Sequence, residues 1–210
     1  MSLHYNFIWY RVAKTGTRSV DQFLKDHIAD YEYLTGNDAG ESYRKCLANS
    51  PYTFSFVRHP MDRLASAWRN KIRDNGSAAQ GSKSRPRRRR LGLNDADYNR
   101  ARKDFDFFVS ALSASVLLSE DIHFKPQSEI LKDLKVGFIG RFENLGPDFD
   151  IVKKAIFLGD TIPQSLLPRK NETIKSKVHD EKAYSNEVLG TVAELYAEDF
   201  SCFGYSIRMP

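Results

Sequence analysis

The segment Lys14-Thr15-Gly16-Thr17-Arg18-Ser19 combines the groups that bind an oxyanion. A glycine lets the backbone approach an anion closely, hydroxyl side chains add donors, and a lysine adds a positive charge. The segment is not a Walker A motif, because its lysine precedes the glycine. These residue types predict an anion-binding loop. The alternative is an ordinary strand-to-helix turn whose Lys14 side chain points into water.

A second anion-binding pattern begins at Arg58, at the end of an apolar segment. Ser66 lies two turns into the helical pattern that follows, on the face shared by Asp62, Arg69 and Arg73. An arginine fork together with a helix hydroxyl can clamp an oxyanion. Spacing alone leaves an exposed, charged helix face as an equal alternative.

The elements that must position these residues alternate between strands and helices. β-branched and aromatic residues predict strands at 7–12, 53–57 and 136–140. Apolar residues at helical spacing follow each strand, with Ser19 as the N-cap of the first helix. The same spacing predicts further helices around 105–118, 127–134 and 188–196. This alternation implies a three-layer, P-loop-like α/β domain with a central parallel sheet, whose ligands bind beyond the carboxyl ends of the strands.

Composition places the chain among globular proteins. Its 210 residues are 41% hydrophobic and 28% charged, which excludes wholesale disorder and predicts a single domain over 1–210. Cys46 and Cys202 lie far apart without metal-ligand spacing, so neither a disulfide framework nor a metal site is indicated. No apolar segment is long enough to span a bilayer, and no secretory signal opens the chain. We therefore expect a soluble, cytoplasmic protein.

The net charge of +5 comes from one segment. Residues 76–93 hold six basic residues and no acid, so the rest of the chain has 26 basic residues of the 32 against all 27 acidic ones. The glycine, serine and arginine content predicts a flexible surface loop at about 75–93. Its run Arg87-Arg88-Arg89-Arg90 has three interpretations: a solvated surface, a site that attracts an anionic substrate such as a uronate- or sulfate-bearing saccharide, or a nucleic-acid site. No aromatic residue interleaves with the run, which disfavours the third.

Two motifs resemble those of sulfotransferases that use 3′-phosphoadenosine-5′-phosphosulfate (PAPS). The segment Arg11–Val20 is similar to their 5′-phosphosulfate loop, and Phe56–Lys71 is similar to their 3′-phosphate motif. The element His123-Phe-Lys-Pro-Gln127 resembles one of Golgi carbohydrate sulfotransferases, and Gly137–Leu145 resembles their following strand. The segment Leu167–Thr173 resembles the late loop of heparan and uronyl 2-O-sulfotransferases. The resemblance runs from about residue 5 to residue 205, and it implies a soluble bacterial-type member of that carbohydrate branch.

The resemblance implies a role for each matching residue. The 5′-phosphosulfate would be held by Lys14, Thr15, Gly16, Thr17 and Arg18, with Ser19 assisting at the helix start. The 3′-phosphate would be held by Arg58 and Ser66, and the adenosine side would be covered by Arg169, Lys170 and Thr173. Ala13 replaces the usual proline and Arg18 a smaller residue, as in the uronyl-type branch. The implied reaction moves a sulfuryl group from PAPS to a carbohydrate hydroxyl without a metal and releases adenosine 3′,5′-bisphosphate (PAP).

Sulfuryl transfer needs a group that stabilises the leaving oxygen and a base for the acceptor hydroxyl. Lys14 is the candidate for the first role. Among the histidines, His123 is the preferred base, with a hydrogen-bonded structural histidine as the alternative reading of that residue. Glu143 is a weaker candidate that could instead pair with Arg141. Two other function classes stay open: a P-loop-like nucleotide or sugar kinase, and a basic nucleic-acid-binding module.

Overall fold

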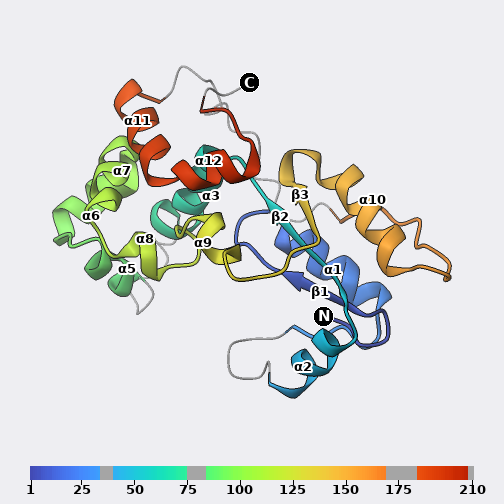
Figure 1. Cartoon of the computed structure of the whole chain (residues 1–210). Helices are drawn as coiled ribbons and strands as arrows, with labels where there is room; N and C mark the ends of the chain where they lie inside the picture. The colour runs from blue at the N-terminus through green and yellow to red at the C-terminus, as the bar shows by residue number, and fades with distance from the viewer. Residues whose placement is uncertain (34–39, 75–83, 169–183, 208–210) are drawn as a thin grey trace. The chain divides into compact units, whose positions relative to one another are not determined.

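Three short apolar segments form one parallel sheet in the order β1-β2-β3 (Figure 1). The strands are β1 (Phe7–Tyr10), β2 (Tyr52–Val57) and β3 (Phe138–Arg141). Phe7 lies opposite Tyr52 on β2, and Phe54 lies opposite Phe138 on β3. The three strands predicted from the sequence are thus confirmed to within two residues at each end. All three carboxyl ends lie at the same edge of the sheet.

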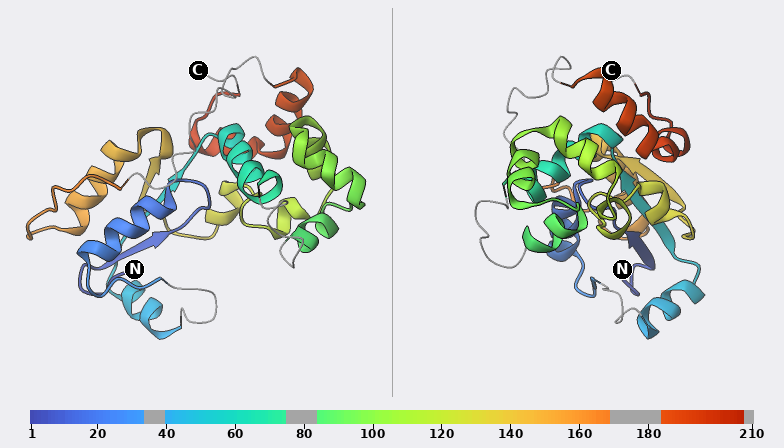
Figure 2. Two further views of the ribbon diagram at one scale, coloured as in Figure 1. Left: turned by 180° about the vertical axis from the view of Figure 1, so that it is seen from behind. Right: turned by 90° about the vertical axis from the view of Figure 1, so that its left-hand side faces the viewer.

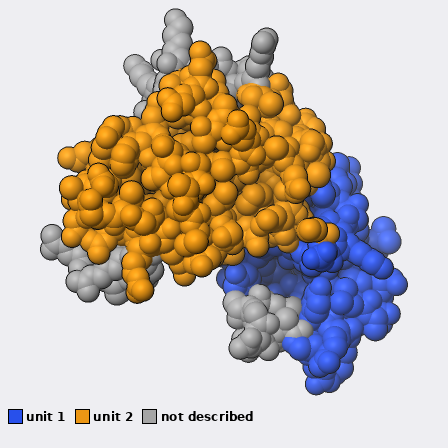
Figure 3. Space-filling model, turned by 60° about the vertical axis from the view of Figure 1, so that its left-hand side comes forward, with its two compact units in different colours: residues 1–57, 133–172 blue, residues 58–132, 173–210 orange. Residues whose placement is uncertain are grey.

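The computed structural model describes residues 1–33, 40–74, 84–168 and 184–207. The chain divides into two compact units, coloured separately in Figure 3. Unit 1 comprises Met1–Val57 and Asp133–Glu172, and unit 2 comprises Arg58–Lys132 and Thr173–Pro210. The prediction that 1–210 form one domain stays a prediction.

Unit 1 has helices on both faces of its sheet. Side chains alternate along β1, so that Phe7 and Trp9 join one apolar cluster while Ile8 joins another. The first cluster is covered by α1 (Thr17–His27) and α10 (Leu145–Ile156), which lie on the same side of the sheet (Figures 1 and 2). The second is covered by Cys46 of α2 (Glu41–Ala48). This confirms the predicted α/β fold with helices flanking a parallel sheet.

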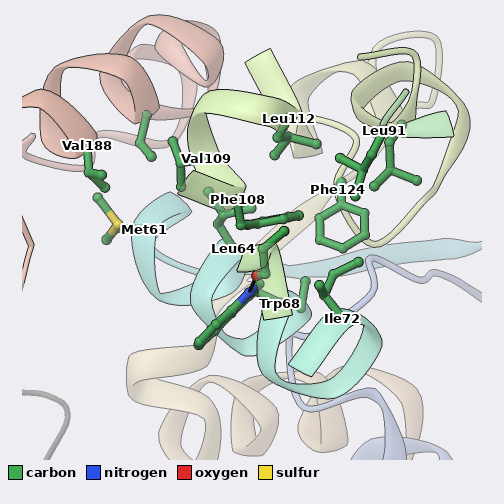
Figure 4. Packing of buried hydrophobic residues seen from close by; sticks show 14 of the residues in the cluster. Met61, Leu64, Trp68, Ile72, Leu91, Phe108, Val109, Leu112, Phe124 and Val188 are labelled. Carbon is green, nitrogen blue, oxygen red and sulfur yellow. Dashed lines mark hydrogen bonds between the residues drawn. The ribbon is translucent and has the colours of Figure 1, made fainter. Parts of the chain in front are cut away.

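Unit 2 is helical in the part of the chain that the structure describes. Its elements are α3 (Pro60–Trp68), the π-helix η2 (Arg69–Arg73), α5 (Ser84–Arg90), α6 (Asp95–Lys103), α7 (Phe105–Ser113), α8 (Leu117–Glu120), α9 (Gln127–Leu131), α11 (Asn186–Leu195) and α12 (Ala197–Phe203). Unit 1 also contains the 3-10 helix η3 (Phe142–Asn144). Figure 4 shows their core, in which the Phe124 ring packs among side chains that include Leu64 and Ile72. The helix predicted around 105–118 is two helices, because the chain turns after Ser113.

Two local predictions need correction. The predicted loop at 75–93 contains the helix α5, so residues 84–90 are helical, and residues 75–83 lie outside the described part of the chain. The mostly buried pair of Arg87 with Asp121 favours this helix, and Arg88 and Arg90 pair with Asp95 and Glu120 at the surface. The first helix begins at Thr17 with Gly16 as its N-cap, so Ser19 is a buried residue of the first turn and not the cap.

Candidate functional site

The predicted anion loop connects β1 to α1 at the carboxyl edge of the sheet. Its backbone takes two left-handed turns, at Lys14 (φ 75°) and at Gly16 (φ 79°). Left-handed backbone costs a non-glycine residue about 1 kcal/mol, and such outliers cluster at ligand sites. Gly16 caps α1 without a side-chain hydrogen bond, and the first turn of α1 carries no acidic residue. The N–H groups at the start of the helix therefore favour an anion.

The hydroxyl residues of the loop have different roles. The Thr15 side chain is buried, and its hydroxyl donates to the Val12 carbonyl at 2.8 Å. That hydroxyl holds the loop together, so Thr15 could serve an anion only through its backbone N–H. Thr17 is half-buried and Arg18 is exposed, which leaves both side chains accessible to a ligand.

Gly16 has no room for a side chain. A Cβ built there would lie 2.6 Å from Leu145 Cδ2 and 3.3 Å from Phe142 Cδ2. The backbone of the loop is therefore drawn tightly against η3 and α10 within unit 1. A close approach of this kind is the reason that the position requires glycine.

Gly16→Ala is expected to lower the free energy of unfolding by about 1–3 kcal/mol, because the added methyl meets both steric crowding and an unfavourable φ. Gly146→Ala is the matched control, since no heavy atom lies within 4 Å of its added Cβ in α10. The control is expected to keep or raise stability by about 0.5–1 kcal/mol. Urea unfolding of both variants checks the prediction, and equal midpoints would contradict it.

Arg58, the predicted 3′-phosphate residue, follows β2 directly and is held by its backbone. The Arg58 N–H donates to Gln127 Oε1 at 2.9 Å, and Gln127 Nε2 donates to the Arg58 carbonyl at 2.8 Å. Gln127 is fully buried at the start of α9. The structure thus brings the His123–Gln127 element and Arg58 together in unit 2, which no spacing in the sequence indicated. The side chain of Arg58 takes no part in this clamp.

Asp199 anchors the clamp from α12. One of its carboxylate oxygens accepts hydrogen bonds from the Gln127 N–H (2.9 Å) and from Gln127 Nε2 (3.1 Å), and the other accepts from the Ser128 N–H (2.7 Å). Asp199 has no exposed surface. A buried carboxylate with three donors fixes the position of the helix start.

Asp199→Ala is expected to lower the free energy of unfolding by about 3 kcal/mol, because it leaves buried donors without an acceptor. The neighbouring Glu198 is exposed on the same helix, so Glu198→Ala is expected to stay within about 0.5 kcal/mol of the wild type. Chemical denaturation measures both. A loss in the Asp199 variant no larger than in its control would refute the anchoring role.

The helix after Arg58 does not present a solvated charged face. Arg69 is 6% exposed, Asp62 and Ser66 are half-buried, and Arg63 is 1% exposed. The helix changes at Arg69 into the π-helix η2, a distortion that is frequent at functional sites. The alternative of an exposed charged face is therefore wrong for this segment.

His123 lies in a loop that unit 2 holds in place from three sides. Arg63 donates to the carbonyls of Ile122 (3.0 Å) and Lys125 (2.9 Å), and the Tyr196 hydroxyl donates to the Phe124 carbonyl at 2.6 Å. Phe124 is fully buried and lies against the Phe108 ring, with centroids 5.6 Å apart. The backbone on both sides of His123 is thereby fixed.

The His123 ring is oriented by a carboxylate. His123 Nδ1 lies 2.7 Å from Asp121 Oδ1, and the His123 N–H donates to the same oxygen at 3.0 Å. Burial and the positive charges of Lys71 and Arg87 lower the pKa of His123 from its ordinary 6.5, although Asp121 opposes the shift. The imidazole is therefore neutral at pH 7. A neutral ring whose Nδ1 faces a carboxylate presents Nε2 as an acceptor, which is the form that a general base requires.

Sequence reasoning missed the residues that hold this site. Arg63 lies outside the charged face predicted after Arg58, and Asp121, Tyr196 and Asp199 carry no motif. Their partners lie far away in the chain, so a single sequence offers no signal for them. The alternative base Glu143 is exposed in η3. The predicted adenosine-side residues Arg169, Lys170 and Thr173 lie outside the described residues.

Two features are absent from the part of the chain that the structure describes: a cluster of metal ligands and a membrane-spanning helix. Over residues 1–33, 40–74, 84–168 and 184–207, no group of three His, Cys, Asp or Glu side chains could hold a metal ion. Within those same ranges, no helix is long and apolar enough to cross a membrane.

Comparison with known proteins identifies the family. The family model described as "Sulfotransferase family" matches residues 1–206, which covers both units. No curated protein and no solved structure matches the chain. The match includes the loop between β1 and α1, the Arg58 helix and the His123 element, and it extends over nearly the whole chain. The chain therefore belongs to the sulfotransferase family.

Proposed function

We propose that the protein transfers the sulfuryl group of PAPS to a hydroxyl of a carbohydrate acceptor. The observation that carries the proposal is the tight left-handed loop at Lys14–Gly16, which opens α1 without a side-chain cap and has no space for a Cβ at Gly16. Such a loop suits the doubly charged phosphosulfate end of the donor. Family membership supports sulfuryl transfer as the reaction and disfavours the kinase alternative.

Residues are assigned to the parts of the donor by their resemblance to the family motifs. The side chains of Lys14, Thr17 and Arg18 and the backbone of Thr15 and Gly16 would bind the 5′-phosphosulfate, while Ser19 supports the first turn. Arg58 and Ser66 would bind the 3′-phosphate. We further assign Arg169, Lys170 and Thr173 to the adenosine side.

The donor supplies an activated sulfuryl group, and the chain supplies a base and a cation. As the acceptor oxygen bonds to sulfur, its proton passes to His123 Nε2, and the bond from sulfur to the bridging phosphate oxygen breaks. Lys14 stabilises the negative charge that develops on that oxygen. The orientation of His123 by Asp121 supports this assignment of the base.

The carbohydrate class of the acceptor is proposed from the His123–Gln127 element, which resembles that of carbohydrate sulfotransferases. The nucleic-acid alternative is weakened, because Arg87, Arg88 and Arg90 are paired with carboxylates. Ion pairing reduces the positive charge available to a polyanion.

Radiolabelled PAPS tests the proposal when it is incubated with the protein and a panel of acceptors. The panel contains a uronate polysaccharide, a neutral polysaccharide, a lipid and a small alcohol. We expect label on a polysaccharide, and the uronate-bearing one first. Label on the lipid or small alcohol alone would overturn the acceptor class, and absence of transfer to every acceptor would overturn the activity on this panel.

A further inference from the structure

Arg87 differs from the other paired arginines of α5. Its Nε lies 2.9 Å from Asp121 Oδ2, and the two side chains are only 18% and 7% exposed. Arg88 and Arg90 instead pair with Asp95 and Glu120, whose side chains are 85% and 52% exposed. Pairs at the surface contribute little, whereas a desolvated pair fixes the geometry of both partners. The basic run is thus divided between one buried contact and solvated ones.

The carboxylate of Asp121 is shared between two partners on opposite oxygens. Oδ1 accepts both hydrogen bonds from His123, and Oδ2 accepts the one from Arg87. Two partners on different oxygens hold the carboxylate plane in one orientation. Burial raises the pKa of Asp121, but the hydrogen bonds from His123 and the charge of Arg87 outweigh it and hold the pKa well below its ordinary value. An ionised carboxylate can only accept, so the proton of neutral His123 lies on Nδ1.

We propose that Arg87 and Asp121 are positioning residues that keep His123 in the Nδ1–H tautomer with Nε2 open to a substrate proton. This inference rests on the proposed function, in which His123 is the base. It gives the basic segment a role inside the site rather than as a free surface for an anion. The contacts from Arg87 to Asp121 and from Asp121 to His123 join the helix α5 to the reacting group.

The charges around His123 predict whether its pKa rises or falls when the charge of Arg87 is removed. Asp121 raises the pKa of His123, whereas Lys71 and Arg87 lower it. Removing the positive charge of Arg87 therefore raises the pKa, and the fraction of protonated, inactive base at pH 7 grows. The acid limb of the pH–rate profile moves to higher pH by the same amount.

The test uses imidazole NMR of the whole chain with three variants. Arg87→Gln is expected to raise the pKa of His123 and to mix its tautomers. Arg87→Lys keeps the charge and is expected to restore most of both properties. Arg88→Gln is the matched control, with the same loss of charge on the same helix, and it is expected to leave the His123 signals unchanged.

The outcomes separate this inference from the proposed function. If the pKa and tautomer of His123 are the same in Arg87→Gln as in wild type, the positioning role is refuted, whatever the activity. If Arg87→Gln does not fold, Asp121→Asn takes its place, and a His123 pKa and tautomer equal to those of wild type in that variant would refute the positioning role. Unchanged turnover in His123→Ala would instead refute the base, while the NMR result would still decide the positioning of His123.

Discussion

His123→Ala is expected to lower kcat by about 10²–10⁴-fold while PAP binding stays within about twofold of wild type. The base acts on the acceptor hydroxyl and makes no contact with the nucleotide in the proposed mechanism, so kcat and nucleotide affinity separate. His4 is exposed and supplies the matched control, His4→Ala, with unchanged kcat expected. Added imidazole is expected to restore part of the lost activity to the His123 variant.

The pH dependence of wild-type kcat belongs to the same prediction. The pKa of His123 is lowered from 6.5, chiefly by burial, so the neutral base persists into mildly acidic solution. Activity should be constant near pH 7 and fall as the pH drops through that lowered pKa. This acid limb of the pH–rate profile should vanish in His123→Ala. A variant that keeps wild-type kcat, or an acid limb that survives the substitution, would show that another group is the base.

Lys14→Ala is expected to lower kcat by about 10²–10³-fold, because it removes the cation proposed to stabilise the leaving oxygen. Lys25 on the exposed face of α1 pairs with Asp21 and gives the control Lys25→Ala, which is expected to retain activity. Single-turnover kinetics with saturating donor measure the chemical step. Equal rates for the two variants would contradict the role of Lys14.

A second substitution separates chemistry from fold at the same position. Lys14 holds a left-handed backbone that glycine adopts without strain. Lys14→Gly is therefore expected to keep or raise the melting temperature although it abolishes the same activity as Lys14→Ala. Loss of both stability and activity in Lys14→Gly would mean that the side chain is structural.

Local pattern was sufficient for the three strands and the helices that follow them, but not for every helix of unit 2 or for the contacts that complete the site. The strands were predictable because β1 and β2 are short apolar runs ended by charged residues, and Gly16 was identified because its neighbours have the composition of an anion loop. The positions at which the helices of unit 2 begin and end were less predictable. Asn94 and Asp104 cap α6 and α7 by accepting hydrogen bonds from the N–H groups of Asp97 and Phe107, and only these short-range caps mark the two helix starts.

The contacts around His123 could not be predicted for a different reason. Arg87 lies 34 residues from Asp121, and Asp199 lies 72 residues from Gln127. Only the folded chain brings such partners together. Composition moreover favoured a loop for the arginine run, and tertiary ion pairs with Asp121 and Glu120 override that preference. Local composition is a weak guide wherever long-range pairing decides the structure.

The central claim is that the chain binds the nucleotide of PAPS, and calorimetric titration of PAP tests it most directly. Arg58→Ala is the informative variant, because Gln127 holds the backbone of Arg58 and alanine keeps that clamp. Arg88→Ala is the control for loss of a positive charge. We predict tight PAP binding by wild type and control, a loss of about 10- to 100-fold in Arg58→Ala, and weak binding of ATP with magnesium. A preference for magnesium-ATP, or no binding of PAP by the wild-type protein, would contradict the account.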